Sequence, residues 1–161
     1  MNSEITIRQA VDEDIPLILS FINKIAEYEK LSSEVIATEE ILRESLFGKK
    51  PSAEVILAYV DNQPVAYAVY FYNFSTFIGK KGLYLEDLFV LPEFRGGGLG
   101  KKMLVYLFKK AADENCGRME WAVLDWNEPA INFYKSLGAK PMDEWTTFRV
   151  DEEVLKKYSS Y

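Results

Sequence analysis

The stretch Arg95-Gly96-Gly97-Gly98-Leu99-Gly100 decides the fold of this chain. The run before it, from Gly82 to Leu91, is rich in branched and aromatic residues and predicts a strand, while apolar residues recur at helical spacing from Leu99 to Asn115. Glycines in a strand-to-helix turn let backbone amides approach an anion, and the helix start adds unpaired N–H groups and a positive dipole end. The stretch therefore predicts a turn that can hold a pyrophosphate, although a tight connection without a ligand would also use glycine here.

Two other phosphate motifs do not fit this turn. The phosphate loop of nucleoside triphosphatases needs Gly-x-x-x-x-Gly-Lys followed by Ser or Thr, and no Ser or Thr follows Lys101. The dinucleotide fingerprint Gly-x-Gly-x-x-Gly fails as well, because the third glycine comes two residues after the second. The sequence therefore excludes both motifs.

The composition favours one domain spanning residues 1–161. The chain has 161 residues, 48% of them hydrophobic, which is enough for one core. It has neither a cationic, apolar leader nor an apolar run near the ~20 residues that span a bilayer. We therefore expect a cytoplasmic protein with no membrane partner. The single cysteine, Cys116, excludes an internal disulfide, and we expect it to serve packing or to be an idle thiol rather than a nucleophile.

The chain contains no histidine, which restricts its chemistry. Imidazole is the usual general base near neutral pH and the commonest metal ligand, so Ser-His-Asp, Cys-His and His-metal chemistries are excluded and we expect no metal. Acid–base work must use Glu, Asp, Tyr, Lys, Cys or water. The net charge of −6 argues against a nucleic-acid partner and suits a cationic small substrate.

The remaining patterns predict alternating strands and helices. In chain order we expect a strand at Ile5–Arg8, a helix at Ile15–Leu31 capped at Asp12, a short helix from Thr38 to before Gly48, a hairpin of Ala53–Val60 and Val65–Phe74, the strand and helix around the glycine turn, a strand at Met119–Leu124, a helix at Glu128–Leu137 closed by Gly138, a strand at Trp145–Val150 and a C-terminal helix. This order implies an α/β (α+β) fold with a mixed sheet and helices on its faces.

The glycine turn matches the acetyl-CoA motif Gln/Arg-x-x-Gly-x-Gly/Ala, and with it the chain resembles the GCN5-related N-acetyltransferase superfamily. Leu83 to Val90, Trp126 to Tyr134 and Ala26 to Glu29 are similar to segments of the diamine (spermidine/spermine) and thialysine acetyltransferases. The similarity covers the chain in the same order. It implies a mixed central sheet flanked by helices, a bulge in the strand that carries Glu86 and Asp87, a splayed central strand pair and a homodimer.

The resemblance implies acetyl-CoA as co-substrate and no metal. The residues that it assigns to the coenzyme are Leu88, Phe89, Val90, Arg95, Gly96, Gly97, Gly98, Leu99, Gly100, Lys101, Asn127, Glu128, Pro129, Ala130 and Tyr134. The backbone amides of Leu88 and Val90 would bond the pantetheine arm and polarise the carbonyl. Asn127 also fits a plain helix cap, with Pro129 tolerated in the first turn.

The resemblance also assigns two catalytic residues. A free alkylamine is almost fully charged at neutral pH, so a base must remove a proton from it. Glu86 matches the family's base, which acts through water. Tyr134, about two turns after the cap, matches the general acid that protonates the coenzyme's thiolate. The alternatives are that Glu86 only binds substrate and that Tyr134 only packs.

A small primary amine is the implied acceptor: a diamine, a polyamine or a thialysine- or lysine-like compound. The residues expected to hold it are Tyr28, Glu29, Glu86, Asp87 and Asp125, although Asp125 also fits plain surface acidity. Regular alternation in a strand predicts that either Glu86 or Asp87 points away. The segment from Asn73 to Phe77 replaces a tryptophan-containing segment of polyamine-specific relatives, which favours a shorter diamine or a lysine-like amine.

Two other functions stay open on the sequence. A protein of this fold can bind acetyl-CoA as a sensor or assembly partner without turnover, although the presence of both Glu86 and Tyr134 argues against that. Transfer to a protein's Lys or N-terminal amine is the second alternative, and it would need an open peptide groove.

Overall fold

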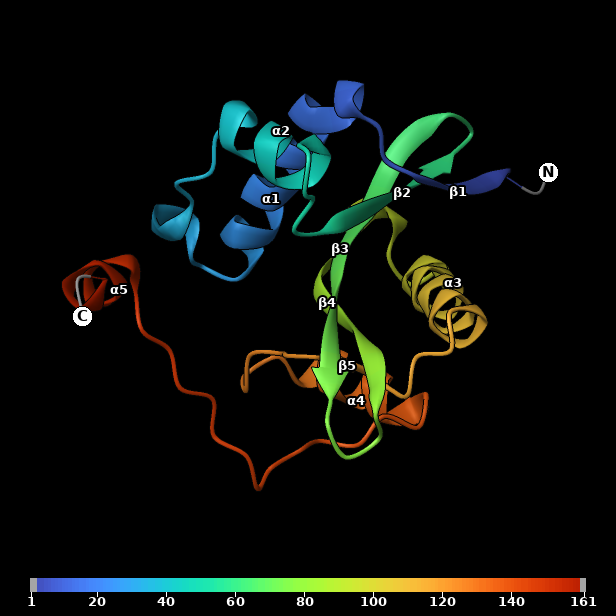
Figure 1. Cartoon of the computed structure of the whole chain (residues 1–161). Coiled ribbons are helices and arrows are strands. Elements are labelled where there is room, and N and C mark those ends of the chain that lie inside the picture. The colour runs from blue at the N-terminus through green and yellow to red at the C-terminus, as the bar shows by residue number, and fades with distance from the viewer. Residues whose placement is uncertain (1–2, 160–161) are drawn as a thin grey trace. The chain divides into compact units, whose positions relative to one another are not determined.

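The computed structural model describes residues 3–159, and the chain divides into two compact units, Met1–Ala122 and Val123–Tyr161 (Figure 1). The first contains the strands β1 (Ile5–Gln9), β2 (Glu54–Val60), β3 (Gln63–Ser75), β4 (Lys80–Val90) and β5 (Met119–Trp121), the helices α1 (Ile15–Tyr28), α2 (Glu39–Phe47) and α3 (Leu99–Asp113), and short 3-10 turns at Asp12–Asp14, Ser32–Glu34 and Pro92–Phe94. The second contains α4 (Glu128–Ser136) and α5 (Glu152–Tyr158). A single domain over residues 1–161 stays a prediction.

The five strands form one mixed sheet in the order β1-β2-β3-β4-β5, which confirms the expected fold class. Neighbours from β1 to β4 are antiparallel, whereas β5 runs parallel to β4. The expected hairpin joins β2 to β3, and its turn is made by Asp61 and Asn62 with φ of 47° and 66°. Asp and Asn tolerate this left-handed conformation, so two residues are enough for the turn.

Helices pack on both faces of the sheet, with α1 and α2 on one side and α3 on the other (Figure 1). On the α1 side, the ring of Phe21 stacks on Tyr67 with centroids 5.1 Å apart and meets Phe89 edge-on at 6.4 Å. On the other side, Met103 and Leu107 of α3 are fully buried. Each such side chain stabilises the fold by about 1.5–3 kcal/mol when it is removed from water. These buried side chains lie against the middle strands, where the core is centred.

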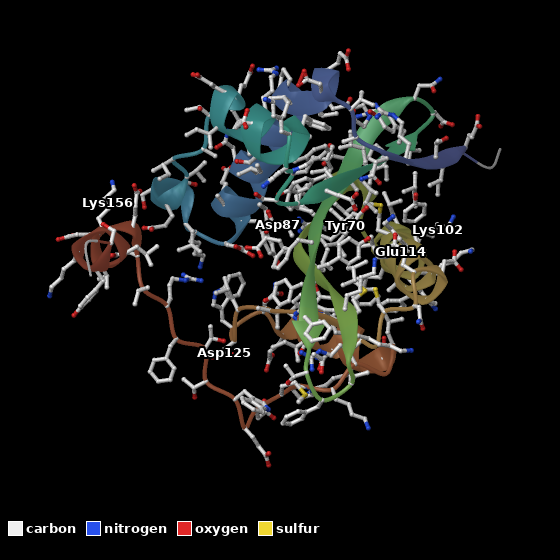
Figure 2. The ribbon with its side chains drawn as sticks, in the orientation of Figure 1. Tyr70, Asp87, Lys102, Glu114, Asp125 and Lys156 are labelled. Carbon is white, nitrogen blue, oxygen red and sulfur yellow. The ribbon has the colours of Figure 1, made fainter. Side chains whose placement is uncertain are left out.

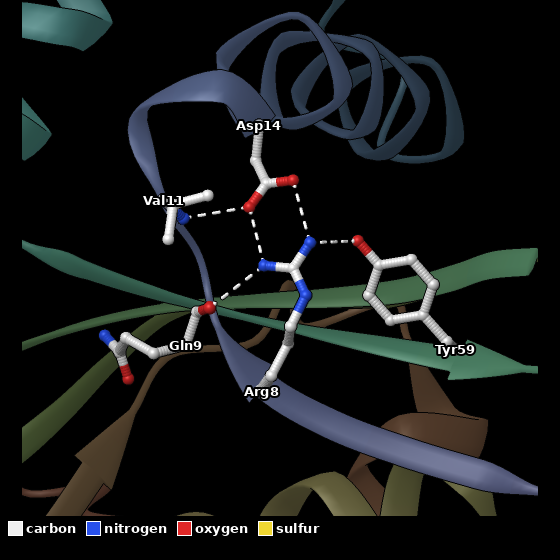
Figure 3. Close-up of polar contacts among 5 residues, drawn as sticks. All are labelled: Arg8, Gln9, Val11, Asp14 and Tyr59. Atoms are coloured by element: carbon white, nitrogen blue, oxygen red, sulfur yellow. Dashed lines mark hydrogen bonds and ion pairs between the residues drawn. The ribbon is translucent and has the colours of Figure 1, made fainter. Parts of the chain in front are cut away.

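The entry into α1 is fixed by an ion pair between β1 and the turn that follows it (Figure 3). The Arg8 guanidinium donates to both carboxylate oxygens of Asp14, at 2.7 and 2.9 Å, and to the Tyr59 hydroxyl at 2.6 Å. Asp14 also accepts the N–H of Val11 at 2.8 Å. The guanidinium holds the pKa of Asp14 below its ordinary value. Asp14, rather than the expected Asp12, therefore precedes the helix.

Helix ends agree with the sequence where a local residue sets them. Thr38 caps α2 by accepting the N–H of Ile41 at 3.2 Å, as expected. Gly138 follows α4 with a φ of 90°, which favours glycine. In contrast, α1 ends at Tyr28 and not at Leu31, because Lys30 adopts a φ of 62°.

The prediction of a strand at Trp145–Val150 was wrong, because this segment forms no strand. Branched and aromatic residues fit a strand only when a neighbouring strand offers backbone partners. Among the described residues of its own unit there is no strand to supply them. The strand expected at Met119–Leu124 is also shorter than predicted: β5 spans only Met119–Trp121.

Candidate active site

A bulge in β4 places the predicted acidic residues. Tyr70 on β3 pairs with Leu85, and Val69 pairs with Asp87, so Glu86 is the extra residue between them. One extra residue reverses which side chains face which side of the sheet. Leu85 therefore shares a face with Tyr70, whereas Asp87 shares a face with Val69 and Tyr67. The bulge that the family resemblance implies thus interrupts the regular alternation from which Glu86 or Asp87 was expected to point away.

Beyond the bulge, β4 continues without β5. The two strands pair only from Leu83–Met119 to Leu85–Trp121, while β4 runs on to Val90. The N–H of Leu91 donates to Val65 on β3 at 2.9 Å. Because N–H groups alternate between the two edges of a strand, the amides of Leu88 and Val90 point away from β3, toward the edge that β5 has left. This is the splayed geometry that the fold class predicts.

Three predicted acceptor residues converge on Tyr67, a residue that the sequence did not single out. The Tyr67 hydroxyl donates to Asp87 Oδ2 at 2.6 Å. Burial, followed by the charges of Asp87, Glu29 and Glu86, raises the pKa of Tyr67. Figure 2 shows Asp87 on the sheet face opposite Tyr70 and Glu114. We use the name acidic cluster for the group of four residues Glu29, Tyr67, Glu86 and Asp87.

The acidic cluster holds carboxylates close together, and a bound cation would reduce the repulsion between them. Burial raises the pKa of the Asp87 carboxyl, and the hydrogen bond from Tyr67 opposes that rise. Burial also raises the pKa of Glu29 at the end of α1, and the nearby charge of Asp87 raises it further. Two partly buried carboxylates, one of which raises the pKa of the other, form a site suited to a protonated amine.

Arg95 packs beside this cluster. Its Nε donates to the carbonyl of Val90 at 2.8 Å, and its guanidinium lies over the rings of Tyr28 and Phe89, 4.7 and 5.2 Å from their centroids. Tyr28, Phe89 and Arg95 line a pocket of about 360 Å³, together with Lys24 and Glu93. Arg95 thus links the end of β4 to the end of α1. Its predicted contact with pyrophosphate stays a prediction.

The glycine turn has the backbone that an anion cradle requires. Gly96 and Gly98 adopt φ of 81° and 80°, and a Cβ on Gly96, Gly97 or Gly98 would meet no atom within 4 Å. Gly98 precedes α3 and accepts the N–H of Lys102 at 3.0 Å. The amides from Leu99 to Lys101 lie in the first helical turn, where no intrahelical acceptor exists. These residues fit a pyrophosphate group.

The other predicted coenzyme residues lie on α4 in the second unit. Asn127 accepts the N–H of Ala130 at 3.4 Å and so caps the helix, with Glu128 and Pro129 in its first turn. Tyr134 is partly buried, and its ring lies 5.6 Å from that of Phe133. Asp125 is exposed two residues before the cap (Figure 2). The approach of these residues to the coenzyme and the acceptor stays a prediction.

Within residues 3–159, no group of three or more His, Cys, Asp or Glu residues is arranged to hold a metal ion. In the same part of the chain, no helix combines the length and apolarity needed to cross a bilayer.

Comparison with known proteins identifies the family. The family model described as "Acetyltransferase (GNAT) family" matches residues 19–139 of this chain. This chain belongs to that family. The acetyltransferase is 37% identical to the thialysine N-epsilon-acetyltransferase of Sus scrofa over 96% of this chain and 97% of the relative. It is 33% identical to spermidine/spermine N(1)-acetyltransferase-like protein 1 of Homo sapiens, over 92% of this chain and 23% of that longer protein. An integron cassette protein of V. cholerae shares the fold, with a TM-score of 0.81, 24% identity and 98% coverage of each chain.

These matches confirm the resemblance seen in the sequence. The acetyltransferase acts on an amine, and members of its family use acetyl-CoA as the acetyl donor. Sequence reasoning missed Tyr67, although one signal was available. Val65, Tyr67 and Val69 share one strand face, and a buried phenol there needs a hydrogen-bond acceptor.

Proposed function

We propose that this enzyme transfers the acetyl group of acetyl-CoA to a small primary amine that carries a second charged group, such as a diamine, a polyamine or a thialysine- or lysine-like compound. The acidic cluster carries this proposal. Burial raises the pKa of both Glu29 and Asp87, and the charge of Asp87 raises the pKa of Glu29 further, so a bound ammonium group would offset that repulsion. The thialysine-acetylating relative supports the same class of acceptor.

In this proposal, Glu86 prepares the nucleophile. A primary amine has a pKa near ~10.4 in water and must lose a proton before it can attack. Glu86 stands at the bulge, exposed to water and beside Asp87, so it can accept that proton through a water molecule. Asp87 and Glu29 hold the second cationic group, and Tyr28 and Asp125 contribute further walls of the acceptor site.

The donor side uses backbone groups and one phenol. Acetyl-CoA supplies the acetyl group as a thioester. The glycine turn and the start of α3 hold its pyrophosphate, with Arg95 and Lys101 adding positive charge. The amides of Leu88 and Val90 polarise the carbonyl, the start of α4 from Asn127 to Ala130 borders the pantetheine arm, and Tyr134 donates a proton to the leaving sulfur. The amine attacks directly, with no acyl-enzyme. We also propose that the enzyme is a cytoplasmic homodimer.

An acceptor panel tests the proposed function. The enzyme is incubated with acetyl-CoA and thialysine, lysine, short diamines, polyamines or peptides, and free thiol is followed while mass spectrometry identifies the product. Acetylated diamine or thialysine is the expected result. Acetyl-CoA binding without any acetylated acceptor would favour a sensor, and acetylation of peptides alone would favour a protein acetyltransferase.

A further inference from the structure

Tyr67 is a buried side chain at the centre of the acidic cluster. Its residue is 0% exposed, and its ring stacks on Phe21 with an interplanar angle of 7°. Phe21 in turn meets Phe89 edge-on. A ring packed in this way has no space to turn away from its place. The packing of α1 on the sheet therefore fixes where the Tyr67 hydroxyl points.

That hydroxyl serves one acceptor atom, Asp87 Oδ2, at 2.6 Å. Burial and the three nearby carboxylates keep the phenol protonated, because they raise the pKa of Tyr67. Burial alone would favour the neutral form of Asp87, and the hydrogen bond from Tyr67 is what lowers the pKa of that carboxyl. A fixed, permanently protonated donor thus acts on the carboxylate.

The charged groups around Asp87 come from three directions. Glu29 faces it from the end of α1, Glu86 precedes it on β4, and Arg95 lies over Phe89, two residues further along the same strand. Burial disfavours an ionised Asp87. The hydroxyl of Tyr67 is the group that opposes this effect.

We propose that Tyr67 is a positioning residue for the acceptor amine: its hydroxyl, 2.6 Å from Asp87 Oδ2, holds the Asp87 carboxylate in place, so that Asp87 binds the cationic end of the substrate. This inference rests on the proposed function. A phenylalanine would stack on Phe21 in the same way, so packing alone does not require the hydroxyl.

The test is Tyr67→Phe, with Tyr70→Phe as the matched control. Tyr70 lies on the same strand, is equally buried, and donates to Gln9 Oε1 at 3.2 Å on the opposite face. We expect Tyr67→Phe to raise KM for the amine about tenfold and to leave KM for acetyl-CoA unchanged. The acid limb of the pH profile of kcat/KM should move to higher pH, because Asp87 then takes up a proton more readily. Tyr70→Phe should change neither quantity.

A double-mutant cycle with Asp87→Asn shows whether Tyr67 acts through Asp87. In the Asp87→Asn background, Tyr67→Phe should raise KM for the amine no further. A full second increase overturns the proposal, as does a Tyr67→Phe variant whose amine KM and pH profile match those of Tyr70→Phe.

A measurement without turnover separates this inference from the proposed function. NMR titration of the Asp87 carboxyl in isotope-labelled enzyme should give a higher pKa in Tyr67→Phe than in the wild type. An unchanged pKa overturns the positioning role whatever the substrate is. A raised pKa, in an enzyme that acetylates no amine of the panel, overturns the substrate assignment and with it the role of Tyr67 in acceptor binding.

Discussion

Leu85 and Asp87 lie two positions apart on β4 and yet face opposite sides of the sheet, because Glu86 is a bulge between them. Leu85 joins the core on the same face as its cross-strand partner Tyr70, whereas Asp87 reaches the Tyr67 hydroxyl on the α1 side. The same bulge turns the amides of Leu88 and Val90 toward the edge where β5 has ended. One inserted residue thus arranges both the acidic cluster and the open strand edge.

Glu86→Gln tests the proposed base at this bulge. The amide keeps the size of the side chain but cannot accept a proton at neutral pH, so we expect kcat to fall about 100-fold with a smaller change in KM for the amine. Steady-state kinetics over a range of pH measures both. A large rise in KM with an unchanged kcat would mean that Glu86 only binds substrate.

Tyr134→Phe tests the proposed general acid. Loss of the phenol proton should lower kcat by a factor of about ten or more, because the sulfur then leaves without a proton donor. Acetyl-CoA binding, followed by calorimetry, should stay as in the wild type. Turnover at the wild-type rate would remove Tyr134 from the mechanism.

Gly97→Ala tests the anion cradle separately from the fold. The φ of Gly97 is not left-handed, and a Cβ there meets no atom within 4 Å, so the thermal stability should not change. The new methyl group would project into the space that a pyrophosphate needs, and the Kd for acetyl-CoA should rise about tenfold. Gly98→Ala, at a φ of 80°, should also lower Tm. Unchanged coenzyme affinity in Gly97→Ala would contradict the cradle.

Glu114→Gln tests the ion pairs that hold the end of α3. Hydrogen bonds from Lys110, Lys81 and Tyr72 lower the pKa of Glu114 to about 2, from an ordinary 4.5. A depressed carboxylate pKa stabilises the fold above pH 4.5, and that contribution is lost as the pH falls toward 2. We expect Glu114→Gln to reduce the free energy of unfolding by about 1 kcal/mol at neutral pH.

The control for this prediction is Asp113→Asn, since Asp113 pairs with Lys109 one turn away on the exposed side of the helix. Its effect should be close to zero. Urea denaturation at neutral and acidic pH measures both variants. Equal losses at both pH values in Glu114→Gln would contradict the assignment of the stability to the ionised carboxylate.

Local sequence signals predicted most of the sheet and its helices. The hairpin of β2 and β3 was set by Asp61 and Asn62, which tolerate the turn, and α2 by the cap at Thr38. The expected strand at Trp145–Val150 failed because a strand depends on a partner edge, and composition does not reveal whether one is present.

The candidate site was predicted less fully than the fold. The family resemblance supplied Glu29, Glu86 and Asp87, yet their meeting point at Tyr67 depends on the register of β3 against β4. A bulge changes that register by one residue, and no pattern in the run from Lys80 to Val90 marks Glu86 as its place. The family resemblance implies a bulge in this strand, but its exact position and the contact between Asp87 and Tyr67 come only from the folded chain.

The most direct test of the proposed function compares two acceptors with the wild-type enzyme and acetyl-CoA: a short diamine and the monoamine of the same length. Mass spectrometry identifies the acetylated product, and thiol release gives kcat/KM for each. If the acidic cluster binds a second cationic group, the diamine is acetylated with a kcat/KM at least about tenfold higher. Equal values for the two amines, or no acetylated amine at all, would contradict the account.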